Sequence, residues 1–173
     1  MKMDKVANSG NDEFYTPLYA IVPIAKYVKP NSTIWCPFDT EDSLFVKYFR
    51  SLGHKVIATH INSNENFFDM ACPTCDYIIS NPPYSVKGQV IEKLFEIGKP
   101  FAMLVGCLGV FESKRRYNIF SKNKFEVMNF DKRVSFIGAD REVKVNTPFS
   151  SIYICHNILP KQIMFREIDK TNV

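Results

Sequence analysis

Residues 76–84 read Asp-Tyr-Ile-Ile-Ser-Asn-Pro-Pro-Tyr, a largely apolar run that leads directly into two consecutive prolines. The run Tyr77–Ser80 is typical of a strand that is buried on both faces of a parallel sheet. Pro82 and Pro83 end this strand, because each proline fixes its own φ angle and lacks a backbone N–H. In open α/β sheets, ligands bind outside the carboxyl ends of the strands. The turn Asn81–Tyr84 is therefore the first place where we expect a functional site.

The sequence around this strand alternates between short β-prone runs and apolar-periodic helices. This alternation is typical of an α/β fold in which helices cover both faces of an open, mostly parallel sheet. We find no repeat, low-complexity tract or linker, so we expect residues 1–173 to form a single domain, with residues 1–10 flexible. The expected helices cover 17–28, kinked or divided by Pro23, 43–52, ended by Gly53, 86–97, ended by Gly98, and about 112–120. The expected strands cover 33–37, 55–58, 77–80, 101–106, about 125–130, and a terminal β pair at 151–156 and 162–166 that adds an antiparallel terminal strand.

The composition indicates an ordinary globular domain. A chain of 173 residues that is 46% hydrophobic and contains 15 Phe can bury one sizeable core. No stretch approaches the roughly 20 consecutive apolar residues of a membrane helix, and residues 1–13 lack the apolar segment of a secretory signal. We therefore expect a cytoplasmic protein without a membrane partner.

The five cysteines fit a reducing compartment. Their number is odd, and their spacing is not that of a disulfide framework. Cys72 and Cys75 form the only CxxC pair, whereas a structural zinc site normally needs four ligands in paired clusters. We expect the cysteines to serve mainly as small core residues, and we expect no metal.

The net charge of +4 is unevenly distributed along the chain. Residues 1–83 carry a net charge of −2 and residues 84–173 a net charge of +6. A basic C-terminal half suits a partner that bears phosphates, although exposed Lys and Arg are common on any surface. Nucleic acid, either DNA or RNA, is thus a candidate partner that charge alone does not select.

The turn Asn81–Tyr84 offers hydrogen-bond acceptors on a rigid backbone. The exocyclic amine of adenine is a poor nucleophile because its lone pair is delocalised into the ring. A catalyst must therefore draw its N–H bonds toward fixed acceptors and direct the lone pair at an electrophile. Asn81 Oδ1 and the Pro82 carbonyl are two such acceptors, and Tyr84 can hold a base by stacking. The alternative is a plain loop, since Asn and Pro favour turns in any protein, but the position at a strand end favours the chemical interpretation.

This turn also carries a resemblance to a known family. An NPPY motif after an apolar strand resembles the signature of N6-adenine and related amino methyltransferases, in particular the short phage-encoded DNA adenine methyltransferases. Further segments resemble parts of that family in the same order, so that nearly the whole chain is covered. They are Asn11–Pro17, similar to the N-terminal AdoMet-contacting segment, Cys36–Asp39, similar to the start of the first cofactor loop, Asn66–Asp69, similar to the segment that receives the adenine of AdoMet, and 130–136 with 147–151, similar to later strands and the loop between them.

The resemblance implies a single-domain, Rossmann-like class I methyltransferase. Its implied cofactor is S-adenosyl-L-methionine (AdoMet), its implied reaction is site-specific methylation of adenine N6 in nucleic acid, preferably DNA, and its location is the host cytoplasm if the chain is phage-encoded. The implied catalytic residues are Asn81, Pro82, Pro83 and Tyr84. The implied cofactor-binding residues are Tyr15, Thr16, Pro17, Pro37, Phe38, Asp39, His60, Phe68, Asp69 and Asn81.

The first cofactor loop is acidic. Asp39, Glu41 and Asp42 would repel a phosphate, whereas AdoMet carries a sulfonium and an ammonium group. The loop therefore favours a cationic ligand over ATP or a dinucleotide, and the chain contains neither a P-loop nor GxGxxG. The same acids also suit a helix N-terminus, with Asp39 or Thr40 as the cap.

The chain departs from the family pattern in the first cofactor loop and at the position that binds the cofactor ribose. Thr40 and Asp42 stand where the family has two glycines in the first loop, Cys36 replaces a leading acid, and His60 stands where an acid often binds the cofactor ribose.

Two alternatives to adenine methylation stay open. The first is methylation of RNA or of a protein glutamine amide, and the second is a non-catalytic methyltransferase-fold protein that binds nucleic acid or a host protein. A homo-oligomer or a separate recognition subunit is also open, because the chain has no long insertion for target recognition.

Two basic clusters are candidates for contacts with a nucleic-acid backbone. Such residues would hold the phosphates on either side of a base that leaves its stack. Phe111 and Phe136 can support that base, although aromatic residues are more often core residues. The candidate basic residues are Lys114, Arg115, Arg116, Lys132 and Arg133.

Overall fold

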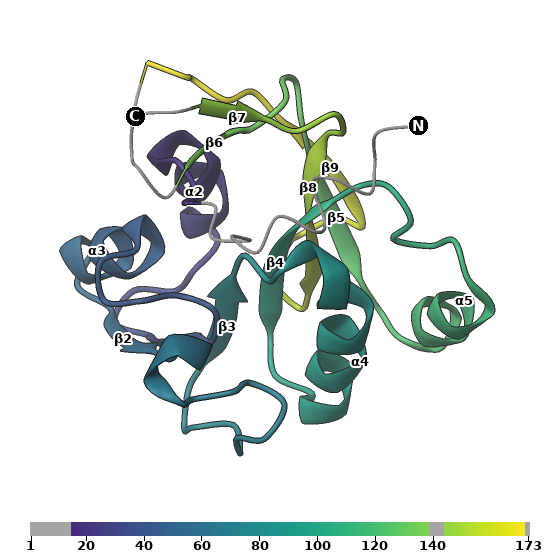
Figure 1. Ribbon diagram of the computed structural model, residues 1–173, viewed down its shortest axis with the longest axis horizontal. Helices are drawn as coiled ribbons and strands as arrows, with labels where there is room; N and C mark the ends of the chain where they lie inside the picture. The colour runs from purple at the N-terminus through teal and green to yellow at the C-terminus, as the bar shows by residue number, and fades with distance from the viewer. Residues whose placement is uncertain (1–14, 139–143, 172–173) are drawn as a thin grey trace.

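A seven-stranded sheet organises the chain (Figure 1). The computed structural model describes residues 15–138 and 144–171, so the segment expected to be flexible, 1–10, and residues 11–14 of the expected AdoMet-contacting segment lie outside the described residues. The sheet has the strand order β2-β1-β3-β4-β8-β5-β9, and a separate two-stranded sheet pairs β6 with β7. The helices are α2 (Leu18–Ala25), α3 (Leu44–Ser51), α4 (Lys87–Ile97) and α5 (Lys114–Lys122), with single 3₁₀ turns η1 (Ile61–Ser63) and η2 (Tyr84–Val86). The strands are β1 (Thr33–Cys36), β2 (Lys55–Ala58), β3 (Tyr77–Ser80), β4 (Phe101–Gly106), β5 (Glu126–Phe130), β6 (Ser135–Ile137), β7 (Lys144–Asn146), β8 (Ser151–His156) and β9 (Ile163–Arg166).

The sheet is mostly parallel, as the alternating pattern predicts. β2, β1, β3 and β4 run parallel to one another, and β9 runs parallel to β5. The antiparallel strand is β8, which lies inside the sheet between β4 and β5. The expected α/β class with an open, mostly parallel sheet is therefore confirmed.

The expected terminal β pair is wrong in one respect, because β8 and β9 do not pair with each other. β5 lies between them. The Glu126 carboxylate at the start of β5 accepts hydrogen bonds from the backbone N–H groups of Asn157, Ile158 and Leu159, at 3.0, 3.2 and 3.3 Å. Asn157 adopts a left-handed conformation with φ of 53°. The chain is thereby carried past the end of β5 and returns on its other side.

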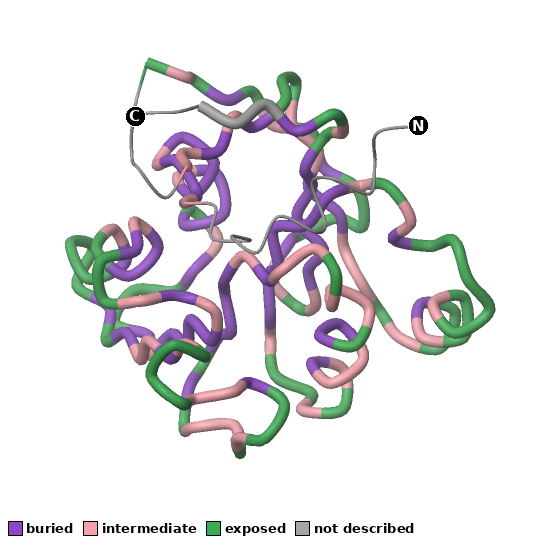
Figure 2. The backbone as a smooth tube through the Cα atoms, in the orientation of Figure 1, coloured by how far each residue is buried: buried purple, intermediate pink, exposed green. Residues whose placement is uncertain are grey.

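The strands separate two hydrophobic cores, one on each face of the sheet. Alternate residues of a strand point to opposite faces. In β3, Tyr77 and Ile79 join the core beneath α2 and α3, whereas Ile78 joins the core beneath α4 and α5. Figure 2 shows the central strands buried along most of their length. The expected helices on both faces are therefore confirmed.

The helix ends follow local chemistry. Ser43 caps α3, because its hydroxyl accepts a 3.1 Å hydrogen bond from Phe45 N, so neither Asp39 nor Thr40 is the cap. Gly98 ends α4 with φ of 71°, a conformation that favours glycine. None of the described helices has both the length and the apolar character needed to cross a membrane.

Candidate active site

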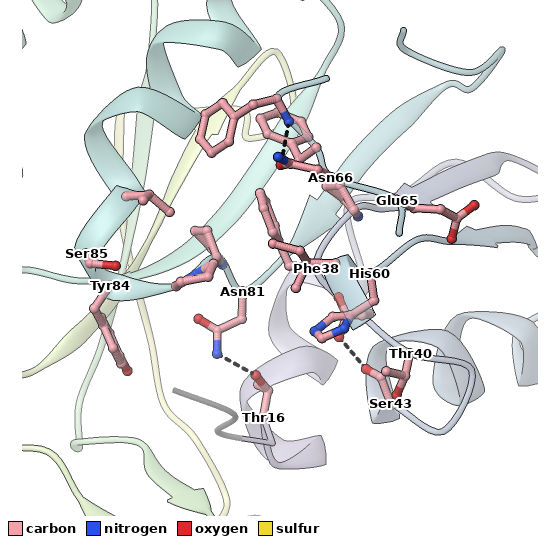
Figure 3. Close-up of a pocket in the computed structure, with 18 of the residues that line it drawn as sticks. Thr16, Phe38, Thr40, Ser43, His60, Glu65, Asn66, Asn81, Tyr84 and Ser85 are labelled. Atoms are coloured by element: carbon pink, nitrogen blue, oxygen red, sulfur yellow. Dashed lines mark hydrogen bonds between the residues drawn. The ribbon is translucent and has the colours of Figure 1, made fainter. Parts of the chain in front are cut away.

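A cavity of about 420 Å³ lies at the carboxyl ends of β1 and β3 (Figure 3). This volume is in the range of small-molecule sites. β1 pairs with β2 on one side and with β3 on the other, so the cavity occupies the point at which the strand order reverses. The lining residues are Tyr15, Thr16, Pro37, Phe38, Asp39, Thr40, Ser43, His60, Ile61, Glu65, Asn66, Phe67, Phe68, Asn81, Pro82, Pro83, Tyr84, Ser85 and Val86.

The Asn81 amide is held in one orientation at the end of β3. Its Nδ2 donates a 3.1 Å hydrogen bond to Thr16 Oγ1. Its Oδ1 is buried and has no hydrogen-bond partner within residues 15–138 and 144–171. In Figure 3 the nitrogen points to Thr16 and the oxygen points to the opposite side. A buried acceptor without a donor costs free energy, and a ligand that supplied an N–H to Oδ1 would remove this cost.

The two prolines after Asn81 supply a rigid wall. Pro82 is buried and Pro83 is half-buried, and both line the cavity. Pro83 O accepts a 3.2 Å hydrogen bond from Val86 N, which closes the η2 turn. Among the residues that the structure describes, the Pro82 carbonyl oxygen accepts no backbone hydrogen bond. Two acceptors, Asn81 Oδ1 and Pro82 O, therefore remain next to each other in the chain.

Tyr84 lines the cavity and packs edge-on against two other aromatic rings. Its ring centroid lies 6.3 Å from that of Phe136 and 5.3 Å from that of Phe149, with interplanar angles of 87° and 76°. Phe136, a candidate for supporting the base, is fully buried and does not line the cavity. Phe149 in turn packs on Gly106 so closely that a Cβ at that position would lie 2.4 Å from Phe149 Cε2. These edge-on contacts restrain the ring of Tyr84, which lines the cavity.

Asp39 is a buried carboxylate in the cavity wall. Ser80 donates a 2.5 Å hydrogen bond to Asp39 Oδ2, and Ser43 donates a short hydrogen bond to Asp39 Oδ1. Burial raises the pKa of Asp39 from 3.8 to about 6, and the two serine hydrogen bonds oppose this rise. A cation in the cavity would stabilise the ionised form.

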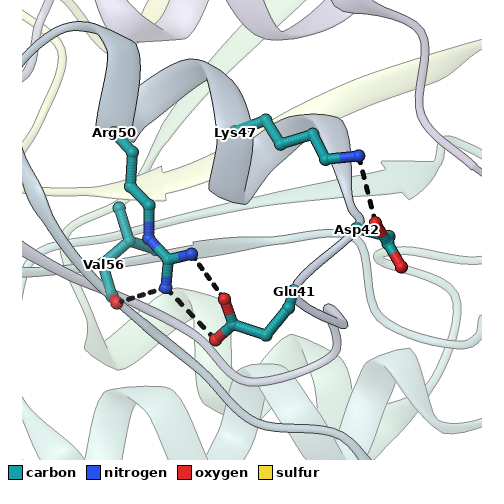
Figure 4. Close-up of polar contacts among 5 residues, drawn as sticks. All are labelled: Glu41, Asp42, Lys47, Arg50 and Val56. Atoms are coloured by element: carbon teal, nitrogen blue, oxygen red, sulfur yellow. Dashed lines mark hydrogen bonds and ion pairs between the residues drawn. The ribbon is translucent and has the colours of Figure 1, made fainter.

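The other two acids of this loop are directed elsewhere (Figure 4). Glu41 forms a two-pronged ion pair with Arg50 of α3, and this hydrogen bonding lowers the pKa of Glu41. Asp42 pairs with Lys47 at 3.1 Å. Neither acid lines the cavity. The expected attraction of the loop for a cation therefore depends on Asp39 alone, because local ion pairs with α3 occupy the other two.

Phe38, Phe67 and Phe68 form an aromatic wall of the cavity. Phe67 packs against Phe38 with a centroid distance of 5.0 Å, and Phe68 packs against Phe67 at 5.4 Å. Lys93 of α4 holds this segment by donating to the carbonyl oxygens of Phe67, Phe68 and Met70, at 2.5, 3.0 and 3.0 Å. Its ammonium also lies 4.8 Å from the Phe67 ring centroid. Motif reading did not identify Lys93, because it lies 23 to 26 residues from these carbonyls.

His60 follows β2 and lines the cavity. Its Nδ1 accepts a 3.2 Å hydrogen bond from Asn62 N. In a neutral imidazole the other nitrogen then carries the proton, so Nε2 is a donor. Glu65 also lines the cavity and brings a carboxylate to it.

Most of the residues that the sequence indicates meet in this cavity. Two do not line it. Pro17 is buried at the N-terminus of α2, and Asp69 is exposed with its carboxylate accepting a 2.8 Å hydrogen bond from Asn66 Nδ2. The lining residues that are not among the expected catalytic or cofactor-binding residues are Thr40, Ser43, Ile61, Glu65, Asn66, Phe67, Ser85 and Val86. Asn66 and Phe67 belong to the segment that was singled out for Asp69, so the segment was indicated although its inward residues were not.

The expected nucleic-acid residues lie outside the cavity lining, and most contact protein groups. Arg115 pairs with Glu92, and Arg116 donates to Gly109 O. Lys132 pairs with Asp131 at 3.2 Å. The remaining two are Lys114, whose ammonium lies 5.1 Å from the Tyr117 ring centroid, and Arg133, which is exposed.

Cys72 and Cys75 are free thiols with their sulfurs 3.9 Å apart. Burial, the largest cause, raises the pKa of Cys75 to about 12, which disfavours the thiolate needed for metal binding. Among the described side chains, no group of three or more His, Cys, Asp or Glu is placed to hold a metal ion.

Comparisons with known proteins identify the fold. No family model matches the chain, and no curated protein matches it. The fold is similar to that of the methyltransferase subunit of a type I restriction-modification system from Streptococcus thermophilus, with a TM-score of 0.55 and 12% identity over 93% of this chain and 48% of that chain. A 23S rRNA methyltransferase, ErmE, aligns with a TM-score of 0.49 and 13% identity over 86% of this chain and 71% of that chain. The chain has a Rossmann-like methyltransferase fold and spans about half the length of the Streptococcus subunit.

Proposed function

We propose that this protein is an AdoMet-dependent N-methyltransferase that acts on the exocyclic amine of adenine in nucleic acid, with DNA as the preferred substrate. One observation carries the proposal. Asn81 Oδ1 is a buried acceptor without a donor among the described residues, and it belongs to a residue that lines the cavity at the switch point of the sheet. An exocyclic amine is a ligand that supplies the missing N–H.

The cavity suits AdoMet in both charge and shape. Asp39 offers a buried carboxylate to the positive charge of AdoMet, and Phe38, Phe67 and Phe68 offer apolar faces to its adenine ring. His60 Nε2 and Glu65 offer a donor and an acceptor for ribose hydroxyls. When bound, AdoMet supplies a methyl group on a sulfonium, which is the electrophile of the reaction.

The Asn81–Tyr84 turn suits the nucleophile. Asn81 Oδ1 and Pro82 O would accept the two N–H groups of the amine, which draws electron density to the nitrogen and fixes the direction of its lone pair. Tyr84, which lines the cavity, would contact the base with its ring. These contacts select an amine and leave the choice among DNA, RNA and a protein amide to surfaces around the cavity.

The fold comparison supports nucleic acid over protein as the substrate. The Streptococcus protein is a methyltransferase subunit of a restriction-modification system, and this chain aligns with about half of it. We further propose that a second copy of the chain or a separate recognition subunit contributes to target recognition.

The test of this proposal is a product analysis. The protein is incubated with AdoMet labelled in the methyl group and with DNA, RNA or a bacterial protein extract, and each polymer is then digested and its methylated products identified by mass spectrometry. We expect N6-methyladenine from DNA. Methyladenine only from RNA would show that RNA is the substrate, and methylglutamine from protein would show that a protein amide is the substrate. If no label is transferred and calorimetry detects no AdoMet binding, the proposed enzymatic function is refuted in favour of a non-catalytic binding protein.

A further inference from the structure

Thr16 connects the N-terminal segment to the Asn81 amide. Its side chain is buried, with 6% of its surface exposed, and its Oγ1 accepts the 3.1 Å hydrogen bond from Asn81 Nδ2. The two residues are 65 positions apart, so only the fold brings them together. The sequence indicated Thr16 as a cofactor contact, whereas its observed side-chain partner is the amide at the reactive turn.

The backbone holds Thr16 in place from both sides. Tyr15 exchanges two hydrogen bonds with Ile137 of β6, Tyr15 N to Ile137 O at 2.9 Å and Ile137 N to Tyr15 O at 3.0 Å. Pro17, with φ of −70°, precedes α2, and its carbonyl accepts a 3.0 Å hydrogen bond from Ala20 N. Thr16 therefore sits on a fixed bridge between a strand and a helix, where its hydroxyl can act as a rigid acceptor.

A primary amide can be placed in two orientations that exchange its oxygen and its nitrogen, and only one of them suits an amine substrate. With Nδ2 bound to Thr16, Oδ1 is presented to the ligand as an acceptor. In the reversed orientation the NH2 group would meet the N–H groups of the substrate, and donor would oppose donor. The hydrogen bond from Asn81 Nδ2 to Thr16 Oγ1 thus belongs to the orientation in which the reactive turn can accept an amine N–H.

We propose that Thr16 is a positioning residue that fixes the Asn81 amide with its oxygen toward the substrate. This role rests on the proposed function, since it matters for catalysis only if Asn81 binds an amine. Loss of one buried hydrogen bond changes an orientation equilibrium by about tenfold. We expect the loss of this hydrogen bond to lower kcat, because Thr16 orients Asn81, the residue that would bind the substrate amine. The affinity for AdoMet should change much less.

The test compares Thr16→Val and Thr16→Ser with a matched control, Thr59→Val. Thr59 is also a buried threonine, 4% exposed, whose Oγ1 accepts a 2.9 Å hydrogen bond from Trp35 Nε1, and it does not line the cavity. Two readouts are taken. One is kcat for methyl transfer together with the AdoMet KM. The other is solvent exchange of the Asn81 side-chain NH2 in nitrogen-15 NMR spectra, in which the resonance is assigned by its loss in Asn81→Ala.

We expect Thr16→Val to lower kcat about tenfold, to keep the AdoMet KM within about twofold, and to speed exchange of the Asn81 NH2. Thr16→Ser should behave as the wild type does, and Thr59→Val should lose stability without a change in kcat or in Asn81 exchange. If Thr16→Val does not fold, Thr16→Ala removes the same hydroxyl without adding bulk.

Two results would overturn the positioning role, namely wild-type kcat in Thr16→Val or unchanged exchange of the Asn81 NH2 in that variant. A wild-type protein that transfers no methyl group refutes the proposed function instead. In that case the NH2 exchange alone decides whether Thr16 orients the amide, so the two failures are distinguishable.

Discussion

The Ser80 hydroxyl donates a 2.5 Å hydrogen bond to Asp39 Oδ2 and so joins the ends of β3 and β1. Ser80 is fully buried and also accepts a 3.3 Å hydrogen bond from Phe38 N. Asn81 is the next residue in the chain. One strand end therefore places both the carboxylate proposed for the cofactor side and the amide proposed for the substrate side of the cavity.

The buried state of Asp39 predicts a pH-dependent stability. Its pKa is about 6 in the folded protein and 3.8 as its ordinary value, so between these values the folded state binds more protons than the unfolded state. Stability from this group is therefore greatest at low pH and falls as the pH rises through that window, by about 3 kcal/mol in total. Asp39→Asn should lack this fall. Urea unfolding of both proteins from about pH 4 to pH 7 measures it, and a constant difference between them across that range would contradict the burial effect.

The same group predicts a pH-dependent affinity for AdoMet. A protonated Asp39 is neutral and loses its attraction for a cation, so affinity should fall as the pH drops through about 6. The dissociation constant at pH 5 should be roughly tenfold higher than at pH 7.5, whereas Asp39→Asn should bind weakly at both values. Titration calorimetry at the two pH values measures this. Equal affinities in the wild type would place the cationic part of the cofactor away from Asp39.

The positions of the strands along the chain were largely predictable, because each central strand is a short apolar run bounded by polar or proline residues. The neighbours of those strands were less predictable. The placement of β8 between β4 and β5 depends on the loop that Glu126 holds at Asn157, and this contact spans 31 residues. Local patterns carry no information about such a contact.

We expect the Lys93 ammonium to support AdoMet binding, because it holds the aromatic wall of the cavity in place. Lys93→Met keeps the apolar stem and removes the ammonium that holds the carbonyls of Phe67, Phe68 and Met70. We expect AdoMet affinity to fall roughly tenfold while kcat at saturating AdoMet stays near the wild-type value, since the reactive turn is untouched. Lys26→Met, at an exposed lysine after α2, is the matched control and should bind AdoMet as the wild type does. An unchanged affinity in Lys93→Met would show that the wall does not need this anchor.

Position 106 has no room for a side chain, because the ring of Phe149, which packs on Tyr84, lies against Gly106. Gly106→Ala would place a Cβ 2.4 Å from Phe149 Cε2, which forces a ring that contacts Tyr84 to move. We expect a stability loss of about 1 to 3 kcal/mol in thermal or urea unfolding, with a fall in activity. Adding Gly106→Ala to Phe149→Ala should cost little, because the opposing ring is gone. Equal losses in the two backgrounds would show that Phe149 is not the cause.

The candidate site was predictable where its residues follow strands, and less so where tertiary contacts decide. Asn81 and Phe38 could be placed because each follows a recognisable strand. Asp69 illustrates the limit, since its carboxylate binds Asn66 in a local turn that leaves Asn66 and Phe67 to line the cavity. The sequence gives no signal for which side of such a turn faces inward.

The central claim is that Asn81 Oδ1 accepts an N–H of the substrate amine during methyl transfer. The most direct measurement is the single-turnover rate of methyl transfer to adenine-containing DNA at saturating AdoMet, for the wild type and for Asn81→Ala, with AdoMet affinity measured in parallel. We predict a rate lower by about 10²- to 10³-fold in Asn81→Ala, with AdoMet affinity nearly intact. A variant that transfers methyl groups at the wild-type rate would contradict the account.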